Sequence, residues 1–205
     1  MCNFLSGLVV QNGDVLTHPM LDSHDDLVTY FKLPDSNAAI PRFVKVELLP
    51  ADWADVSTWH WHVDQDILPA WWDEIGGQAE ATLRARAEQM ILRDGEHRLI
   101  VDGCWIVAGT ADVQDVRAGR IIHVGGSAQI HGVGGSAQIR GVRDSAQIYG
   151  VRANAQIYGV GDSAQIRDVG GSAQIRGVGG SAQIRNVWGS AVHLDASAKA
   201  RLVKD

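Results

Sequence analysis

The chain has 205 residues, 45% of them hydrophobic, which is enough for one large core or two small ones. Its two cysteines exclude a disulfide framework, and no apolar run approaches the ~18 residues that a membrane-spanning helix needs. The opening residues lack the basic and apolar stretches of a secretory signal, so we expect a cytoplasmic protein with no membrane partner.

Charge divides the chain into two parts. Residues 1–114 hold 7 Lys and Arg against 18 Asp and Glu, a net charge of −11, whereas residues 115–205 hold 11 against 6, a net charge of +5. An acidic region followed by a basic one indicates two modules, and the basic module suits an anionic partner. Solvated arginines that keep a repeat structure from associating through its strand edges are the alternative explanation.

The first part of the chain predicts a hairpin and then a short helix. Apolar residues 4–10 precede Asn12 and Gly13, which favour a type I′ turn because both central residues of that turn need positive φ; residues 15–17 form the returning strand. Ser23 has the character of a helix N-cap.

Further along, residues 43–48 and 59–64 alternate between apolar and polar side chains and predict two strands. Residues 78–92 have the apolar spacing and charge pairs of a helix. Residues 99–107 predict a second tight hairpin, which we expect to cover the end of the structure that follows. Together these elements predict an acidic α+β domain over residues 1–108, with an antiparallel sheet and two helices.

From Ser127 to Val187 a nine-residue unit, Ser-Ala-Gln-Ile-Arg-Gly-Val-Gly-Gly, occurs seven times with small changes. A short fixed period is typical of a solenoid. Alternation within the unit turns Ala at position 2 and Ile at position 4 inward and Gln at position 3 and the variable position 5 outward. Val at position 7 points inward again, and positions 8 and 9 form a corner.

These features predict a basic, all-β solenoid (β-helix) over residues 109–205. We expect two units, or about 18 residues, in each coil, because Ala and Ile suit a thin interior. A triangular coil of three units is the alternative. Roughly five coils would stack at the ~4.8 Å spacing of paired strands. Trp188 and a short amphipathic helix within residues 196–203 would form a C-terminal cap.

The repeat resembles the hexapeptide and nonapeptide β-solenoid families, although it lacks the regular turn Asp of the calcium-binding kind. The whole chain, from its opening Met-Cys-Asn-Phe-Leu-Ser and its Asn-Gly-Asp hairpin onward, resembles uncharacterised phage- and prophage-type proteins with similar heads and short tandem-repeat tails. That resemblance implies a phage accessory or counter-defence role in the cytoplasm of a bacterial host cell. It implies no established activity.

One strand carries a candidate metal site. His60, His62 and Asp64 share one face of the strand predicted over residues 59–64, and they are suitable ligands for zinc. Their spacing resembles the first part of the His-x-His-x-Asp-His motif of metallo-β-lactamase-type hydrolases, but Gln65 stands where the last His would be. A polar, solvent-facing strand is the alternative, and the sequence implies no other cofactor.

Cys2 is a candidate nucleophile. It would become the first residue if Met1 were removed, and its own amine could then act as the base. The opening is similar to the Met-Cys-Gly of class II glutamine amidotransferases, with Asn3 in place of the glycine. A small buried cysteine is the alternative interpretation.

The outward position-5 residues form one column along the solenoid, flanked by a ladder of glutamine amides along its axis, and together they are the candidate binding surface. Its members are Gln129, His131, Gln138, Arg140, Gln147, Tyr149, Gln156, Tyr158, Arg167, Arg176 and Arg185. Arginines contact phosphates and tyrosines stack on bases, but a rigid, flat array also suits a protein surface. We therefore expect a non-enzymatic binding protein with a protein partner. A nucleic-acid-binding solenoid is the first alternative and a small metal- or Cys-dependent hydrolase the second. The solenoid ends or edges offer a route to a homo-oligomer.

Overall fold

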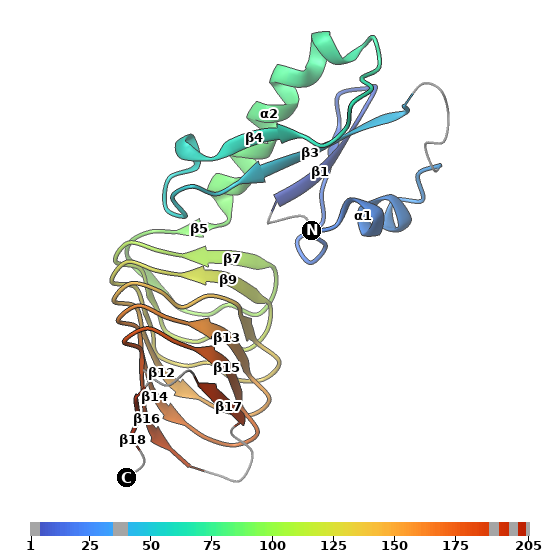
Figure 1. Cartoon of the computed structure of the whole chain (residues 1–205). Coiled ribbons are helices and arrows are strands. Elements are labelled where there is room, and N and C mark those ends of the chain that lie inside the picture. The colour runs from blue at the N-terminus through green and yellow to red at the C-terminus, as the bar shows by residue number, and fades with distance from the viewer. Residues whose placement is uncertain (1–4, 35–40, 189–192, 197–200, 204–205) are drawn as a thin grey trace. The chain divides into compact units, whose positions relative to one another are not determined.

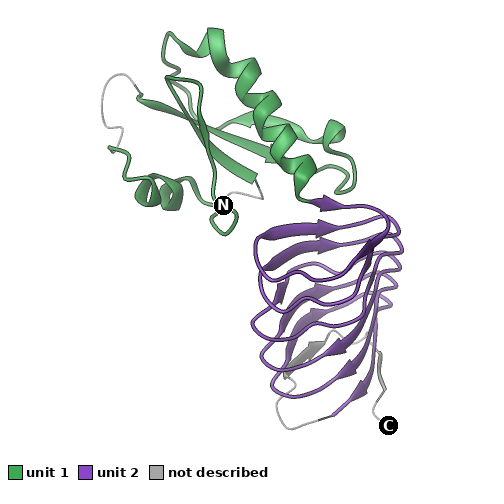
Figure 2. Ribbon diagram, turned by 180° about the vertical axis from the view of Figure 1, so that it is seen from behind, with its two compact units in different colours: residues 1–90 green, residues 91–205 purple. Residues whose placement is uncertain are grey.

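The computed structural model describes residues 5–34, 41–188, 193–196 and 201–203 (Figure 1). It divides into two compact units, residues 1–90 and 91–205 (Figure 2). The first is an α+β unit and the second a parallel β-solenoid, so the predicted fold class is confirmed. Within the described residues, no helix combines the length and the apolar character needed to cross a bilayer.

The first unit is built on a four-stranded antiparallel sheet in the order β2-β1-β3-β4. Its strands are β1 (Leu5–Val10), β2 (Val15–Leu16), β3 (Phe43–Leu49) and β4 (His60–Val63). Two helices, α1 (His24–Tyr30) and α2 (Trp72–Gln89), and the 3-10 turn η1 (Val56–Thr58) complete the unit. Figure 2 shows α2 lying across the sheet.

The predicted hairpin between β1 and β2 is present, but its turn is not type I′. Gly13 has a φ of 88°, whereas Asn12 is not among the residues with positive φ. The amide of Gly13 donates to the Val10 carbonyl at 2.9 Å, and the amide of Val10 donates to the Asp14 carbonyl at 3.0 Å. The loop is therefore a three-residue connection that ends in a left-handed glycine.

Both faces of this sheet are covered. Leu8 and Val9 are neighbours in β1, point to opposite faces and are both fully buried. On the Leu8 face, α1 contributes Leu27 to a cluster that also contains Phe43. The predicted N-cap of α1 is confirmed, since Ser23 Oγ accepts from the amide of Asp26. The α1 helix is thereby fixed over one face of β1 and β3.

The second helix begins earlier and ends earlier than predicted. It runs from Trp72 to Gln89, while Ile91 and Leu92 form strand β5. The Gly76-Gly77 pair, which precedes the predicted helix, lies inside the observed one. The Trp72 indole packs directly against Gly76, where a Cβ would meet it at 2.9 Å. Only a residue without a Cβ lets the indole pack this closely, which explains why the helix contains a glycine at this position.

The second unit consists of two parallel sheets, each of seven strands. The even-strand sheet holds β6 (Glu96–His97), β8 (Asp112–Val113), β10 (Gln129–Ile130), β12 (Gln147–Val151), β14 (Gln165–Val169), β16 (Gln183–Val187) and β18 (Arg201–Val203). The odd-strand sheet holds β5 (Ile91–Leu92), β7 (Cys104–Val107), β9 (Arg120–Val124), β11 (Gln138–Ile139), β13 (Gln156–Val160), β15 (Gln174–Val178) and β17 (His193–Ala196).

The register confirms the predicted coil of about 18 residues. Gln129 pairs with Gln147 in the even-strand sheet, and Gln138 pairs with Gln156 in the odd-strand sheet. Successive nine-residue units therefore alternate between the two sheets, and about five coils stack on one another.

The solenoid begins before the recognisable repeats. Residues 99–107 do not form the predicted antiparallel hairpin, because Ile100 bridges Val116 and β7 pairs with β5 and β9, all in parallel. These first coils are shorter than two full repeat units, since Ile91 already pairs with Ile106. The segment assigned to the end of the α+β domain is thus part of the first coil, and the boundary between the units lies at residue 90 instead of 108.

The C-terminal residues continue the solenoid. Strand β17 pairs with β15 and strand β18 with β16, again in parallel. The predicted amphipathic helix over residues 196–203 is wrong where it can be compared, because Arg201–Val203 is a strand and residues 197–200 lie outside the described part. Strands β17 and β18 thus form hydrogen bonds with the backbone groups of β15 and β16 that would otherwise be unpaired at the end of the repeats.

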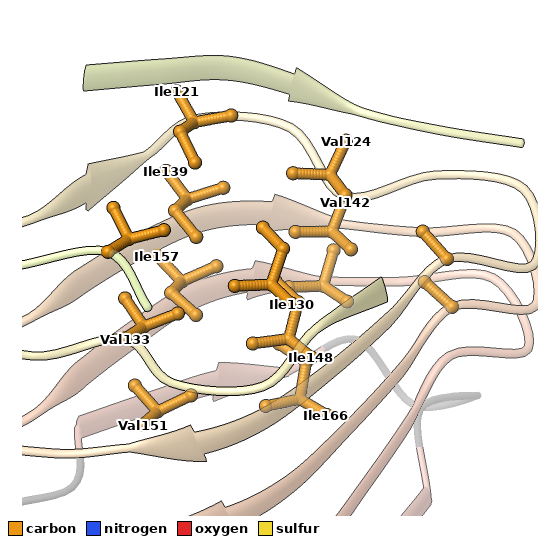
Figure 3. Close-up of a cluster of buried hydrophobic side chains, with 14 of the residues drawn as sticks. Ile121, Val124, Ile130, Val133, Ile139, Val142, Ile148, Val151, Ile157 and Ile166 are labelled. Atoms are coloured by element: carbon orange, nitrogen blue, oxygen red, sulfur yellow. The ribbon is translucent and has the colours of Figure 1, made fainter. Parts of the chain in front are cut away.

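The interior is made of stacked columns of identical side chains. Figure 3 shows Ile121, Ile139 and Ile157 one above another on the odd-strand side, with Ile130 and Ile148 opposite them. In every described coil of the repeat, the Ala at position 2 and the Ile at position 4 are at most 1% exposed. The inward positions predicted from the alternation are confirmed, and the repetition of three apolar residues in each unit supplies the core.

Corners of the described repeats use a left-handed residue at position 9. The seven residues there have φ between 51° and 69°: Gly126, Gly135, Asp144, Ala153, Asp162, Gly171 and Gly180. Glycine and aspartate tolerate this conformation, but a Cβ without a polar group costs roughly 1–2 kcal/mol. Ala153 is therefore the strained member of the series.

We predict that Ala153→Gly stabilises the protein by about 0.5–1 kcal/mol, because the strain released exceeds the entropy that glycine adds to the unfolded chain. Urea denaturation followed by circular dichroism measures the change. The control is Ala155→Gly, two residues further on at position 2 of the next repeat unit, which is fully buried and outside the positive-φ set. That substitution should destabilise by about 1–2 kcal/mol. A loss of stability in Ala153→Gly would contradict the assignment of strain.

Candidate functional site

The predicted binding residues lie on two faces instead of one column. His131, Tyr149, Arg167 and Arg185 belong to or directly follow strands of the even-strand sheet, whereas Arg140, Tyr158 and Arg176 lie along the odd-strand sheet. The flanking glutamines divide in the same way: Gln129 and Gln147 are on the even sheet, and Gln138 and Gln156 on the odd sheet. A single column is excluded because a coil of two units sends alternate units to different sheets.

We define two surfaces from this division. The even-strand face comprises Asp112, Gln129, His131, Gln147, Tyr149, Gln165, Arg167, Gln183 and Arg185. The odd-strand face comprises Gln138, Arg140, Gln156, Tyr158, Gln174 and Arg176. Each face repeats one polar pair for every coil.

In strands β12 to β16 the glutamine accepts a hydrogen bond from the residue two positions further on. The donors are the Tyr149 hydroxyl to Gln147, the Tyr158 hydroxyl to Gln156 at 2.8 Å, Arg167 to Gln165 at 2.7 Å, Arg176 to Gln174 at 3.0 Å and Arg185 to Gln183 at 2.6 Å. These glutamine amide oxygens therefore accept hydrogen bonds from within their own strand. In the predicted ladder they would instead bond to the glutamines of neighbouring coils. Each bond fixes a long side chain in an extended orientation along its strand.

On the even-strand face, side chains of successive coils also stack. Asp112 Oδ1 lies 2.9 Å from His131 Nε2. The His131 ring stacks on Tyr149, with 5.6 Å between the centroids and 13° between the planes. From the next coil, the Arg167 guanidinium lies 5.8 Å from the centroid of Tyr149. The Tyr149 ring is thus flanked by His131 from the preceding coil and Arg167 from the following one.

Trp188 directly follows β16, the last repeat strand of the even-strand sheet, and is 49% exposed. A Cβ on Gly170, in the coil before, would collide with Nε1 of the indole, so the ring lies on that glycine. Trp188 therefore adds an exposed aromatic ring at a corner next to the even-strand face.

In the α+β unit, the predicted metal residues are only partly brought together. His60 and His62 are exposed while Trp61 and Val63 are half-buried, which confirms the predicted alternation. The register places His62 opposite Glu47 and His60 opposite Leu49. Asp64 lies near His62, with 3.9 Å between His62 Nε2 and Asp64 Oδ1.

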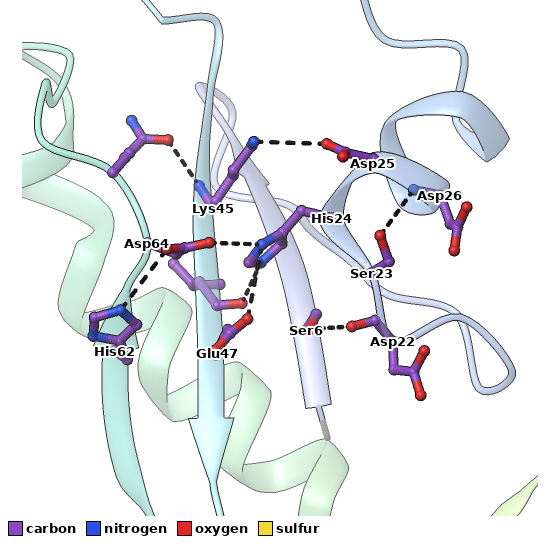
Figure 4. A network of polar contacts seen from close by, with 12 residues as sticks. Ser6, Asp22, Ser23, His24, Asp25, Asp26, Lys45, Glu47, His62 and Asp64 are labelled. Carbon is purple, nitrogen blue, oxygen red and sulfur yellow. Dashed lines mark hydrogen bonds and ion pairs between the residues drawn. The ribbon is translucent and has the colours of Figure 1, made fainter. Parts of the chain in front are cut away.

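Asp64 instead forms a cluster with two residues that sequence reasoning missed, His24 and Glu47 (Figure 4). His24 Nδ1 lies 3.2 Å from Asp64 Oδ2 and 3.8 Å from Glu47 Oε1. His24 and Glu47 are 3% and 8% exposed, whereas the Asp64 side chain is half exposed. The cluster therefore has a buried base and an open rim.

No spacing motif in the sequence marks this cluster. Its members come from the first residue of α1, the middle of β3 and the residue after β4. The alternation within β3 and within β4 is visible in the sequence, but the register that pairs Glu47 with His62 and the packing of α1 that brings His24 over that face are seen only in the structure (Figure 4). The cysteine candidate, Cys2, lies outside the described residues, and Cys104 is buried in β7.

Comparisons of the chain with protein-family models, with curated proteins and with solved structures found no match in any of the three. We therefore infer the function of the protein from the geometry of its own residues.

We predict that His131 and Tyr149 are energetically coupled. Stacked aromatic pairs contribute about 0.5–1.5 kcal/mol beyond area burial, so a double-mutant cycle of His131→Ala and Tyr149→Ala should give a coupling of about 0.5–1 kcal/mol in the free energy of unfolding. The matched control pairs Tyr149→Ala with Arg140→Ala on the other sheet, where the coupling should be zero within error. Equal couplings in the two cycles would contradict the stacked arrangement.

Proposed function

We propose that this chain is a non-enzymatic binding protein whose even-strand face contacts a protein partner. The observation that carries the proposal is the pre-ordered array of hydrogen bonds from Tyr and Arg side chains to the glutamines two residues before them. The stacking of Tyr149 between His131 and Arg167 adds to that order.

Pre-ordering matters because binding normally immobilises flexible side chains. Each rotamer-rich side chain that becomes fixed at an interface costs roughly 0.5–1.5 kcal/mol. Arg167 and Arg185 are already held by their glutamines, so a partner that docks on this face finds part of that cost already met. Tyrosine and arginine are also the residue types that contribute most at protein interfaces.

The charges of the face indicate the chemistry of the partner. Arg167 and Arg185 present two guanidinium groups in adjacent coils, and Asp112, the acidic residue of the face, is paired with His131. Acidic side chains on the partner would meet the two arginines, with apolar surface against the exposed Trp188 ring.

A nucleic-acid partner is supported less well. Single-strand binders stack bases on open aromatic faces. Both sides of the Tyr149 ring have neighbours, His131 and Arg167, so this tyrosine offers an edge to solvent. The division of the arginines between two faces also leaves a shorter basic track than a single column would give.

The biological setting is proposed from the sequence resemblance to phage- and prophage-type proteins. In that setting the partner is a host protein in the bacterial cytoplasm, and the binding serves an accessory or counter-defence role. The division of the chain into an α+β unit and a β-solenoid is compatible with this resemblance, and the proposed setting is based on the resemblance.

The test compares two charge-matched variants of the full chain as bait in nuclease-treated bacterial lysate. One carries Arg167→Glu and Arg185→Glu on the even-strand face, and the other carries Arg140→Glu and Arg176→Glu on the odd-strand face. We expect a protein captured by the wild type to bind the first variant at least about tenfold more weakly, as loss of central arginines implies, and the second within about twofold.

Two outcomes would reject the proposal. Equal binding by both variants would remove the even-strand face as the contact surface. Capture that occurs in untreated lysate, weakens steeply with salt and is absent from nuclease-treated lysate would assign the face to nucleic acid. Circular dichroism of each variant checks that the solenoid is intact.

A further inference from the structure

We propose that His24, Glu47 and Asp64 bind one divalent transition-metal ion of the zinc class. This site is independent of the solenoid and of the binding function proposed for it. One ligand atom from each residue lies within 4.8 Å of the other two. Figure 4 shows the three side chains converging from α1, β3 and the end of β4.

The separations suit the geometry of a small metal site. With bonds of about 2.0–2.1 Å, two ligands of a tetrahedral zinc ion are ~3.4 Å apart. The separation of His24 Nδ1 from Asp64 Oδ2 is 3.2 Å, and that from Glu47 Oε1 is 3.8 Å. Small side-chain rotations would therefore place all three atoms on one ion.

The other nitrogen of His24 provides a second, independent observation. Nε2 lies 3.1 Å from the carbonyl oxygen of Val46, and this oxygen can only accept, so Nε2 carries the hydrogen. In the neutral ring, Nδ1 then presents a lone pair toward the two carboxylates. Lone pair and carboxylate repel each other unless a cation lies between them. A backbone carbonyl that orients a histidine through its second nitrogen is also the usual arrangement around protein metal ions.

Charge points the same way. A histidine that binds a metal is neutral, so in that state the two carboxylates alone would leave an excess of negative charge in a site whose base is buried. The nearby ammonium of Lys45 lies 3.9 Å from Asp25, so it has another carboxylate partner on α1. A divalent cation would neutralise the two acids. A proton on Nδ1, giving an imidazolium, is the competing source of positive charge, and the experiment separates the two.

The donor set selects the class of metal. A mixture of imidazole nitrogen and carboxylate oxygen suits zinc and its neighbours, whereas calcium and magnesium prefer oxygen alone. The rim is open, because the side chains of Asp64 and His62 are 51% and 53% exposed. Water or a fourth side chain can therefore complete the coordination from the solvent side.

The experiment uses the full chain without a histidine tag, stripped with chelator and titrated with Co²⁺ as a spectroscopic substitute for Zn²⁺. We expect visible d–d absorption that saturates at one ion per chain and is displaced by Zn²⁺. Asp64→Asn and Glu47→Gln, which preserve shape, should each weaken binding at least about tenfold. His60→Ala, on the same strand face but opposite Leu49, is the control and should leave binding within about twofold.

A second measurement does not depend on the spectrum. An ion that binds only the folded state raises the melting temperature as its concentration increases. Zn²⁺ should therefore raise the melting temperature of the wild type and of His60→Ala at the same concentrations, whereas folded Asp64→Asn should need at least about tenfold more Zn²⁺ for the same rise.

The proposal fails if the wild type binds no stoichiometric Co²⁺ or Zn²⁺, because a proton then holds the cluster together. It also fails if His60→Ala loses the metal as completely as Asp64→Asn does. That result would assign the ion to the exposed histidines of β4.

Discussion

The structure of the second unit depends on one constraint, the parallel pairing of strands that lie two repeat units apart in the chain. Each coil can satisfy its backbone groups only on the coil before and the coil after. That pairing places every Ala, Ile and Val on its own counterpart, so the columns in Figure 3 follow from the register. It also decides which outward residues become neighbours, and hence which side chains form the stack of His131, Tyr149 and Arg167.

How much the sequence predicts depends on how local the interaction is. The alternation within one unit predicts the inward Ala and Ile, and the N-cap at Ser23 needs only its own helix. The first coil is not predicted because its paired strands are less than two full units apart, so the period that reveals the repeats is absent there. The split of the binding residues between two faces follows from the two-unit coil, although repeat position alone suggests a single column.

The cluster in the α+β unit illustrates the opposite limit. The strand pattern groups Asp64 with His60 and His62, because the three alternate along one segment. The partners of Asp64 in space are His24 and Glu47, which belong to earlier elements of the chain. Nothing in the local pattern distinguishes His24 from any polar residue at a helix start. Only the packing of α1 over β3, with the imidazole bonded to the Val46 carbonyl, brings the three together.

The alternation of units between two sheets has a consequence for how such a chain can change in length. Loss of two adjacent units would shorten the stack by one coil and leave each remaining unit on its original sheet. Loss of one unit would move every following unit from the even-strand sheet to the odd-strand sheet, or the reverse. If residues 154–162 were lost, Arg176 would follow Tyr149 by two units and take the place of Arg167 beside its ring. Because both positions hold arginine, the repeats can recombine by single units and still rebuild this part of the surface.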